Sequence, residues 1–239
     1  LLECLKSLYK FTYNLSFEII VVDNASYDGC KLMLDRNYPD VKFIQNKENT
    51  GFSKANNFGF SFSSGKVILF INPDTELVNS AINIMYSFIV AKKDAGIIGA
   101  TLLNTDKTLQ SSCVRSFPNL FNHFLDIEWL KVKFPQSRLL EMDPFRSDKK
   151  LYKRVNGISG ACIMIKRNVF KKINKFSEDY FMYSEDVDLC YKAQLHGFQN
   201  YFIPKAKIIH HGGGSSKKIS NNFFAVLNIR ESRIKFFKK

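Results

Sequence analysis

The sequence predicts an α/β fold in which helices flank a mostly parallel central sheet. Short apolar, β-branched segments alternate with segments of helical periodicity over residues 1–103, and polar turns follow the strands. Alternation of this kind needs crossover connections, which build parallel sheets covered by helices. With 45% hydrophobic and 14% aromatic residues, a chain of 239 residues can form one large α/β domain with a packed core, or two small ones.

The first half supplies most of this pattern. A helix is predicted at residues 1–9, because its leucines recur at helical spacing, and an apolar strand at 17–22 follows it. The next predicted elements are a helix after Gly29, a strand at 41–45, a helix at 53–62, a strand at 66–71, a helix at 76–91 and a strand at 96–103. In open sheets of this type, ligands bind beyond the carboxyl ends of the strands.

The second half is less regular. Residues 104–154 lose the alternation and combine Pro, Phe and charged residues, which predicts an inserted, partly mobile segment. The elements predicted after it are a strand at 157–165, a helix at 168–173, a helix at 185–196 that Gly197 ends, strands at 199–203 and 207–210, and a basic amphipathic helix at 222–239.

Charge and cysteine content narrow the functional classes. A net charge of +13 suits a polyanionic partner, an anionic membrane surface or a charged substrate, although a lysine-rich composition without a function explains it equally well. Five scattered cysteines without a CxxC pair argue against a disulfide framework or zinc site, and fit a reducing cytoplasm. No apolar run reaches the roughly 18 residues that span a bilayer.

Polar residues follow two of the predicted strands. Asp23, Asn24 and Ser26 come after the first, and either form a plain turn or place a carboxylate against a nucleobase, with phosphate at the next helix N-terminus. Asn72-Pro73-Asp74 follows the strand at 66–71. This turn either caps the next helix or lets Asp74 bind a divalent cation on a diphosphate, for which oxygen ligands favour Mg²⁺ or Mn²⁺.

Three acidic residues, Glu185, Asp186 and Asp188, begin the helix at 185–196. They could simply complement the helix dipole. Three carboxylates within four residues repel one another, however, and need either a positive partner or a chemical task. A general base here could take a proton from an acceptor hydroxyl, and we assign that role to Asp186.

The strand at 207–210 ends in two histidines followed by a glycine run at 212–214. Adjacent strand residues point to opposite faces, so one histidine can reach a ligand site while the other packs or is solvated. We prefer His210 as the ligand. The glycines allow close approach of the backbone to a diphosphate.

Taken in order along the chain, these motifs resemble the inverting nucleotide-sugar glycosyltransferases of family 2, especially the rhamnosyltransferase-like branch. The resemblance rests on Val21-Val22-Asp23-Asn24 with Ser26 and Asp28-Gly29, Asn49-Thr50-Gly51-Phe52 with Asn56 and Gly59, Asn72-Pro73-Asp74, residues 157–162, Glu185-Asp186-Val187-Asp188-Leu189, and His210-His211-Gly212-Gly213. It implies a Rossmann-like GT-A fold, a nucleotide-diphospho-sugar donor and Mg²⁺ or Mn²⁺.

The resemblance also implies a role for each site residue. Donor-binding residues would be Asp23 at the nucleobase, Asn24, Ser26, Asn49, Gly51, Phe52 and Asn56 around the nucleoside, with Asn72 and Asp74. Metal ligands would be Asp74 and His210, the catalytic residues Asp186 and Glu185, and the acceptor side Gly160, Ala161 and Glu185. Asn72 stands where many relatives have Asp, which leaves it to contact ribose or water.

The resulting hypothesis is a single domain over residues 1–239, with a nucleotide-binding half at 1–103 and an acceptor-binding half at 104–239. Relatives have a strand before the helix at 1–9, so the resemblance implies that this first strand is missing. The expected enzyme moves sugar from a UDP- or dTDP-sugar, with dTDP-rhamnose as a candidate, to a hydroxyl of a glycan or lipid-linked glycan, with inversion. We expect it in the cytoplasm, with the membrane's anionic cytoplasmic face as a candidate contact and without nucleic acid.

Two other classes remain open on the sequence. A basic binding module for nucleic acid or anionic membrane would explain the charge and the C-terminal helix. A sugar nucleotidyltransferase shares a related fold, but it would need a glycine-rich phosphate loop after its first strand, in a region that this chain does not contain.

Overall fold

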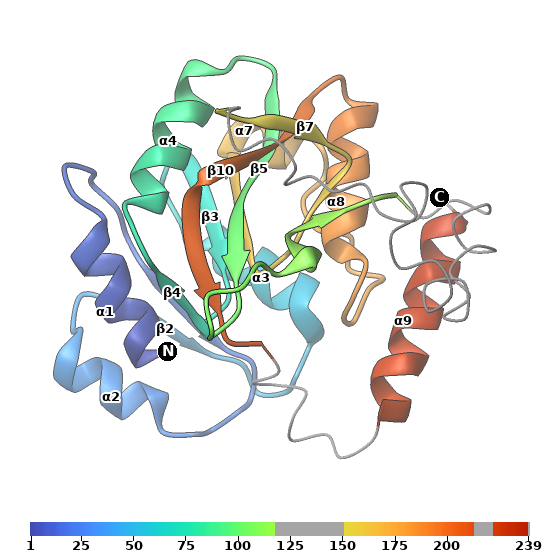
Figure 1. Ribbon diagram of the computed structural model, residues 1–239. Helices are drawn as coiled ribbons and strands as arrows, with labels where there is room; N and C mark the ends of the chain where they lie inside the picture. The colour runs from blue at the N-terminus through green and yellow to red at the C-terminus, as the bar shows by residue number, and fades with distance from the viewer. Residues whose placement is uncertain (118–150, 213–221, 239) are drawn as a thin grey trace.

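The computed structural model describes residues 1–117, 151–212 and 222–238 (Figure 1). Within these residues, six strands form a central sheet whose main order is β3-β9-β5-β10-β4, with β7 paired to β10. The strands are β3 (Val67–Ile71), β9 (Cys162–Lys166), β5 (Ala95–Leu103), β10 (Gln199–His210), β4 (Thr75–Leu77) and β7 (Lys153–Val155).

The predicted α/β class is confirmed, and the sheet is mixed. Strands β5 and β10 are parallel, and β9 runs antiparallel between β3 and β5, so β3, β5 and β10 share one direction. Two smaller pairs lie outside the sheet: β1 (Ile20–Asp23) is parallel to β2 (Lys42–Gln45), and β6 (Val114–Arg115) is antiparallel to β8 (Gly157–Ile158).

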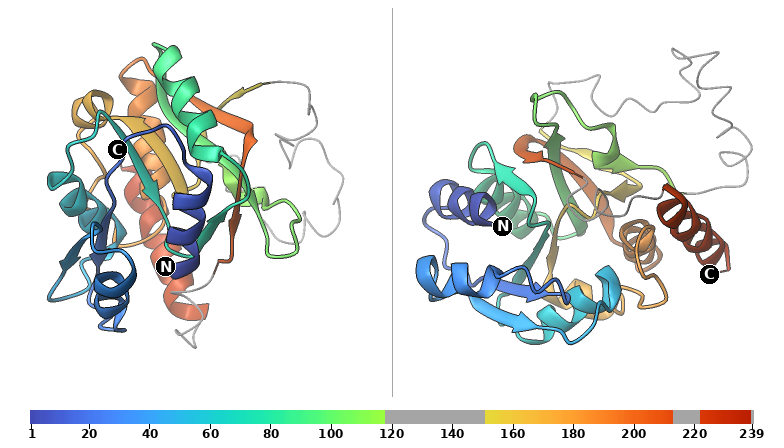
Figure 2. Two further views of the ribbon diagram at one scale, coloured as in Figure 1. Left: turned by 90° about the vertical axis from the view of Figure 1, so that its left-hand side faces the viewer. Right: turned by 90° about the horizontal axis from the view of Figure 1, so that it is seen from below.

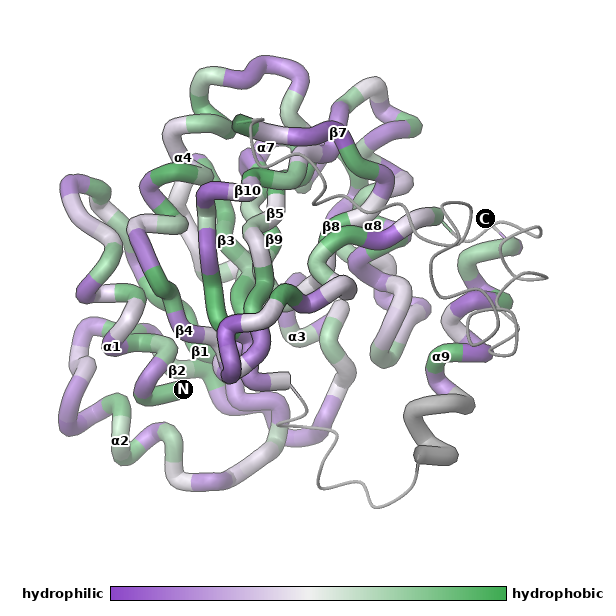
Figure 3. Tube along the Cα trace, viewed as in Figure 1, coloured by the Kyte–Doolittle hydropathy of each residue, from purple (hydrophilic) through white to green (hydrophobic). Residues whose placement is uncertain are grey.

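Helices cover both faces of the sheet. The helices of the described ranges are α1 (Leu2–Phe11), α2 (Cys30–Asn37), α3 (Gly51–Ser61), α4 (Ala81–Ala91), α7 (Arg167–Lys172), α8 (Glu185–Leu195) and α9 (Asn222–Phe237), together with the 3₁₀ turn η1 (Ser111–Cys113). The views of Figure 2 place α4 and α8 on either side of β5 and β10, with which both helices are in contact. Strand β5 is accordingly buried from Ala95 to Leu102, and Figure 3 shows hydrophobic residues concentrated in the central strands.

The helix predicted at 76–91 was wrong in its first part. Thr75–Leu77 form strand β4, and the helix begins only at Ala81. Thr75 and Leu77 are buried while Glu76 is not, which is the period-two pattern of a strand paired with β10. Thr75 therefore does not cap the next helix; its hydroxyl donates to the Asn72 carbonyl at 2.7 Å.

Two other strand predictions differ in extent. The strands predicted at 199–203 and 207–210 are the single strand β10, whose pairing with β5 is irregular between Ile203 and Lys207, around Pro204. The strand predicted at 157–165 is divided into β8 and β9 by the buried residues Ser159 to Ala161, which turn toward α8.

Some predictions lie outside the described residues. These are the greater part of the predicted insertion, residues 118–150, and Gly213 and Gly214 of the glycine run. The basic helix predicted at 222–239 is found as α9, although the side chains of 222–227 are not described. None of the helices within the described ranges has the length and apolar character needed to cross a membrane.

Candidate active site

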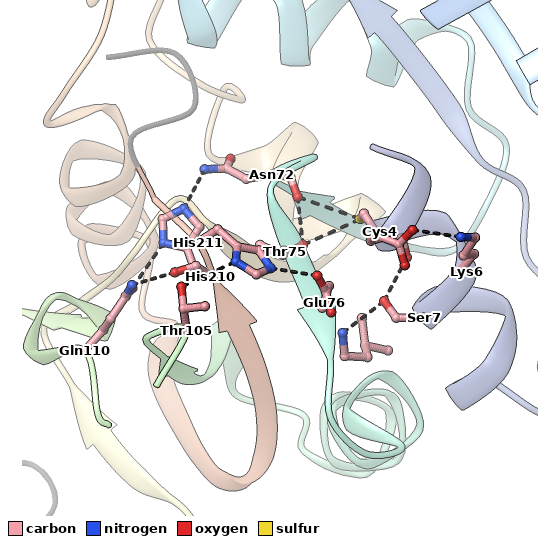
Figure 4. A network of polar contacts seen from close by, with 12 residues as sticks. Cys4, Lys6, Ser7, Asn72, Thr75, Glu76, Thr105, Gln110, His210 and His211 are labelled. Carbon is pink, nitrogen blue, oxygen red and sulfur yellow. Dashed lines mark hydrogen bonds and ion pairs between the residues drawn. The ribbon is translucent and has the colours of Figure 1, made fainter. Parts of the chain in front are cut away.

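Pairing of β4 with β10 brings Asp74 and His210 together. His210 lies opposite Thr75 in this antiparallel pair, so the turn before β4 meets the carboxyl end of β10. His210 Nε2 is 3.4 Å from Asp74 Oδ1. It is also 3.4 Å from the Asn72 side-chain nitrogen, a contact drawn in Figure 4. The His211 backbone N–H donates to the Asp74 carbonyl at 2.9 Å, so a backbone hydrogen bond also joins the turn before β4 to the residue after β10.

Gln110 orients the His210 ring. Its Oε1 lies 3.1 Å from His210 Nδ1, and its Nε2 donates to the His210 carbonyl at 2.7 Å. With the amide so placed, Nδ1 carries the proton that Gln110 Oε1 accepts, and the Nε2 lone pair faces Asp74 and Asn72. An outer residue that fixes the tautomer in this way is typical of metal-binding histidines.

His211 points elsewhere, as strand alternation predicts. Its Nε2 is 2.7 Å from Glu76 Oε1, and its Nδ1 is 3.4 Å from the Thr105 hydroxyl. The two adjacent histidines therefore serve different neighbours, and only His210 faces Asp74.

The residues around Asp74 fit a divalent cation that takes its other ligands from diphosphate and water. In the described ranges no three His, Cys, Asp or Glu side chains are grouped closely enough to hold a metal alone. Mg²⁺ is usually bound by one or two carboxylates together with substrate phosphates and water. Asp74 and His210 supply two ligands, and the Asn72 carboxamide oxygen can turn to supply a third.

Asp186 lies at the start of α8 and is 4% exposed. Its Oδ2 accepts the Gly160 N–H at 2.9 Å, and its Oδ1 accepts the Val187 N–H at 2.8 Å. Arg115 Nε is 3.6 Å from Oδ2 and is the positive partner that the acidic cluster requires. The neighbouring Ala161 carbonyl accepts the Asn72 N–H at 3.0 Å, so Gly160 and Ala161 connect the Asp186 carboxylate to the Asn72 turn.

Glu185 is buried beside Asp186. Its Oε2 has no hydrogen-bond partner among the residues that the structure describes. Burial first, and the Asp186 charge second, raise the pKa of Glu185 to about 8, against the opposing effect of Arg115. Glu185 therefore keeps its proton to higher pH than an exposed glutamate does, while the Asp186 carboxylate pairs with Arg115.

Asp188 anchors the loop that precedes α8. It is 1% exposed, accepts the Ser177 hydroxyl at 2.5 Å and the Tyr180 hydroxyl at 3.4 Å, and lies 3.5 Å from Lys192 Nζ. The third acid of the motif therefore supports the loop through Ser177 and Tyr180.

The predicted nucleobase residue, Asp23, is held at the end of β1. Its Oδ1 accepts the Ser26 N–H and hydroxyl, and its Oδ2 accepts the Tyr27 N–H and the Gln45 amide. Burial raises the pKa of Asp23, but the bonds from Ser26, Gln45 and Tyr27 outweigh it and hold the pKa below its usual range. A base N–H would have to replace one of these donors.

Asn24 ties the β1 turn to the start of α3. Its amide nitrogen donates to Asn49 Oδ1 at 2.7 Å, and its Oδ1 accepts the Thr50 N–H at 3.1 Å. Gly51 follows with φ +82°, and a Cβ there would lie 2.5 Å from the Phe181 carbonyl oxygen. Only glycine suits this contact.

Phe52 and Asn56 extend the same wall along α3. The Phe52 N–H donates to the Phe181 carbonyl at 2.9 Å, its ring meets Phe176 edge to face at 5.7 Å, and Asn56 Nδ2 donates to the Phe52 carbonyl at 2.9 Å. The predicted nucleoside residues thus lie at the end of β1, in α3 and in the turns beside them, and α3 touches the loop before α8. The other two predicted donor residues, Asn72 and Asp74, lie in the turn between β3 and β4.

Comparison with known proteins decides the family. Residues 1–174, most of the chain, match the model of glycosyl transferase family 2. The chain belongs to this family. It is 24% identical over 215 residues to an N-acetylglucosaminyl-diphospho-decaprenol L-rhamnosyltransferase of Mycobacterium tuberculosis, covering 83% of this chain and 67% of that protein. It is also 24% identical over 217 residues to rhamnosyltransferase WbbL of Escherichia coli, covering 87% and 78%.

A solved structure supports the fold. The glycosyltransferase superposes on GalNAc-T7, crystallised with UDP, GalNAc and Mn²⁺, with a TM-score of 0.66 at 15% identity. The match covers 98% of this chain and 44% of GalNAc-T7, so the chain spans less than half of that protein's length. The GT-A fold that the sequence predicts is confirmed.

Sequence reasoning missed two residues of this candidate site. Arg115 and Gln110 reach it from opposite ends of η1, and neither belongs to a recognisable motif. The crowded acids indicated that a cation was needed, but not which one. An open pocket of about 430 Å³ lies beside His210, and its lining residues are Asn104, Leu109, Gln110, Ser111, Ser112, His210 and Gly212.

Proposed function

We propose that this family 2 glycosyltransferase moves a sugar from a nucleotide-diphospho-sugar to a hydroxyl of a glycan or lipid-linked glycan, with inversion. Residues 1–103 bind the donor, and residues 104–239 form the acceptor side. The named activities of the relatives from M. tuberculosis and E. coli support rhamnose as the sugar, and the first of them supports a diphospho-lipid-linked acceptor. We infer dTDP or UDP as the nucleotide and the cytoplasm as the compartment.

One observation carries the proposal. The Gly160–Ala161 dipeptide holds Asp186 on one side through the Gly160 N–H and the Asn72 turn on the other through the Ala161 carbonyl. The carboxylate suited to accept a proton and the residues suited to hold a diphosphate thus share one wall.

The side chains have distinct tasks in this scheme. Asp186 takes the proton of the acceptor hydroxyl, whose oxygen attacks the anomeric carbon as the bond from that carbon to the diphosphate oxygen breaks. One displacement inverts the configuration and needs no covalent enzyme intermediate. Asp74 and His210, with Asn72, would hold Mg²⁺ or Mn²⁺, which when bound neutralises charge on the diphosphate. Neutral Glu185 can donate a hydrogen bond to the acceptor without competing for its proton.

A panel of nucleotide sugars tests the function. UDP-, dTDP- and GDP-sugars are offered with Mn²⁺, with Mg²⁺ or with EDTA, and both the melting temperature and nucleoside diphosphate release are measured. We expect one nucleotide class to stabilise the protein in a metal-dependent way, by about 2.7 kcal/mol at 100 times its Kd. Neither stabilisation nor release with any donor would contradict the proposal.

Asp74→Ala should abolish the metal-dependent part of this stabilisation, because it removes the only carboxylate that faces His210 among the described residues. His210→Ala should have a similar effect. His211→Ala is the matched control, since its ring bonds to Glu76 instead. Calorimetric titration with nucleoside diphosphate, with and without Mn²⁺, measures all three. Retained Mn²⁺ dependence in Asp74→Ala would remove Asp74 from the metal site.

The outer face of α9 is our candidate for the anionic-membrane contact. It exposes Arg230 and Lys238 together with Ile234 (56% exposed) and Phe237 (41%). Basic residues near an anionic bilayer contribute about 1 kcal/mol each, and apolar neighbours add burial. Such a contact would bring the glycosyltransferase to a lipid-linked acceptor.

Sedimentation with vesicles tests this contact. The Arg230→Ala/Lys238→Ala variant should bind phosphatidylserine-containing vesicles at least about tenfold more weakly than the parent chain at low salt, since it loses two favourable charges. Lys54→Ala/Lys93→Ala, which removes two exposed lysines on other elements, should bind as the parent does. Equal binding by both variants would leave α9 without this role.

A further inference from the structure

We propose that helix α9 positions the catalytic carboxylates, with Ser232 as the main positioning residue. This inference rests on the proposed role of Asp186. It concerns the loop of residues 176–184, which leads into Glu185 and Asp186 at the start of α8. In Figure 2, viewed from below, α9 lies beside α8.

The end of this loop has an unfavourable backbone conformation. Tyr183 and Ser184 have φ of +73° and +65°, both in the left-handed region. Neither is glycine, and each such residue costs about 1–2 kcal/mol relative to right-handed backbone. The conformation is what turns Glu185 and Asp186 inward, so contacts from the surroundings must stabilise it.

The first part of the loop is held by α3 and α8. Asn57 on α3 bonds to the Phe176 backbone through both ends of its amide, and Asp188 on α8 accepts the Ser177 and Tyr180 hydroxyls. Phe181 is held through its carbonyl by the Phe52 N–H. These contacts reach as far as Phe181, and the Ser184 carbonyl accepts the Asp188 N–H of α8 at 2.8 Å. Met182 and Tyr183 lie between these two supports.

Helix α9 supplies the contact at Met182. The Ser232 hydroxyl donates to the Met182 carbonyl at 3.0 Å, directly before Tyr183, and Ser232 is 3% exposed. Lys235 Nζ donates to the Asp179 carbonyl at 2.8 Å. Both hydrogen bonds are accepted by backbone carbonyl oxygens, so they restrain the backbone of the loop.

An aromatic contact fixes α9 against α8. Phe236 lies one helical turn after Ser232, and its ring centroid is 5.5 Å from that of Tyr191 on α8 and 6.4 Å from that of Phe117, two residues after Arg115. The same face of α9 thus bonds the loop and packs on the elements that carry Asp186 and its Arg115 partner. Loss of the Ser232 bond should let the left-handed pair relax and displace Asp186.

Hydrogen–deuterium exchange of the full chain tests this, with Ser232→Ala compared with Glu231→Ala, an exposed neighbour on the same helix. Amides of residues 182–188 should exchange faster in Ser232→Ala and at the parent rate in Glu231→Ala. Lys235→Met gives a second, independent variant. Unchanged exchange of 182–188 in both Ser232→Ala and Lys235→Met would overturn the proposal.

Steady-state kinetics without membranes then separates positioning from general stability. With the nucleotide sugar that the parent chain turns over, Ser232→Ala should lower kcat about three- to tenfold, the range of one buried hydrogen bond, and change the donor KM less than twofold. Faster exchange with an unchanged kcat would overturn the positioning role. A parent chain inactive on every donor would instead contradict the proposed function, and the exchange result would still decide whether Ser232 holds the loop.

Discussion

Asp186→Asn is expected to lower the rate of sugar transfer by about 10²- to 10⁴-fold, the usual contribution of a positioned general base. Asparagine keeps the size of Asp186 and an oxygen for the Gly160 N–H, but cannot accept a proton from the acceptor. The fold and nucleoside diphosphate affinity should therefore persist. Transfer kinetics with the active donor, and calorimetric titration with nucleoside diphosphate, measure the two properties separately.

Glu185→Gln is the matched control, because Glu185 keeps its proton to an unusually high pH and glutamine has the size of the protonated side chain. The pKa of Glu185, raised by burial and by Asp186, is about 8, against a usual value near 4. Between about pH 4 and pH 8, Glu185 is ionised in the unfolded chain but not in the folded one, so the free energy of unfolding falls as the pH rises. Glu185→Gln cannot ionise and should therefore melt at a higher temperature than the parent at pH 8. Near-normal transfer by Asp186→Asn with an inactive Glu185→Gln would make Glu185 the base.

Asp188→Ala is expected to lower the free energy of unfolding by about 3 kcal/mol, because the Ser177 and Tyr180 hydroxyls lose their buried acceptor and Lys192 loses its negative partner. In a chain of this size that corresponds to a fall in Tm of about 6–12 °C. Asp188→Asn should cost less, since its oxygen still accepts one hydroxyl.

Thermal melting checks this against Asp40→Ala, which removes an exposed carboxylate from another part of the chain. Asp40→Ala should leave the Tm within about 1–2 °C of the parent value, as surface changes usually do. If Asp188→Ala melted as the parent does and yet lost transfer activity, Asp188 would belong to the chemistry and not to the support of the loop.

The sequence predicts those features that rest on local pattern. Alternating apolar segments are sufficient for the α/β class, and strand alternation is sufficient to separate His210 from His211. Strand β4 was missed because three residues are too few to show a period against the longer helical pattern that follows. Its pairing partner lies more than 130 residues away, and only that pairing makes it a strand.

The same limit applies to the supporting residues of the site. Gln110, Arg115 and Ser232 act on groups that are 50 to about 100 residues distant in sequence, and no local motif marks them. Charge balance indicates that the acids need a cation, but the fold alone selects Arg115. Candidates for the reacting residues can thus be proposed from composition and spacing, whereas the residues that orient them become visible only through the tertiary contacts.

The irregular pairing of β10 has an evolutionary consequence. Ile203 pairs with Ala100 and Lys207 with Thr101, so β10 carries surplus residues around Pro204 before it resumes pairing toward His210. A one-residue slip of the remaining strand would turn its buried face outward. We therefore expect insertions and deletions to be tolerated at the bulge, where the chain can change length while the spacing from Lys207 to His210 stays fixed. Homologous chains can then differ in length around Pro204 while His210 keeps its position.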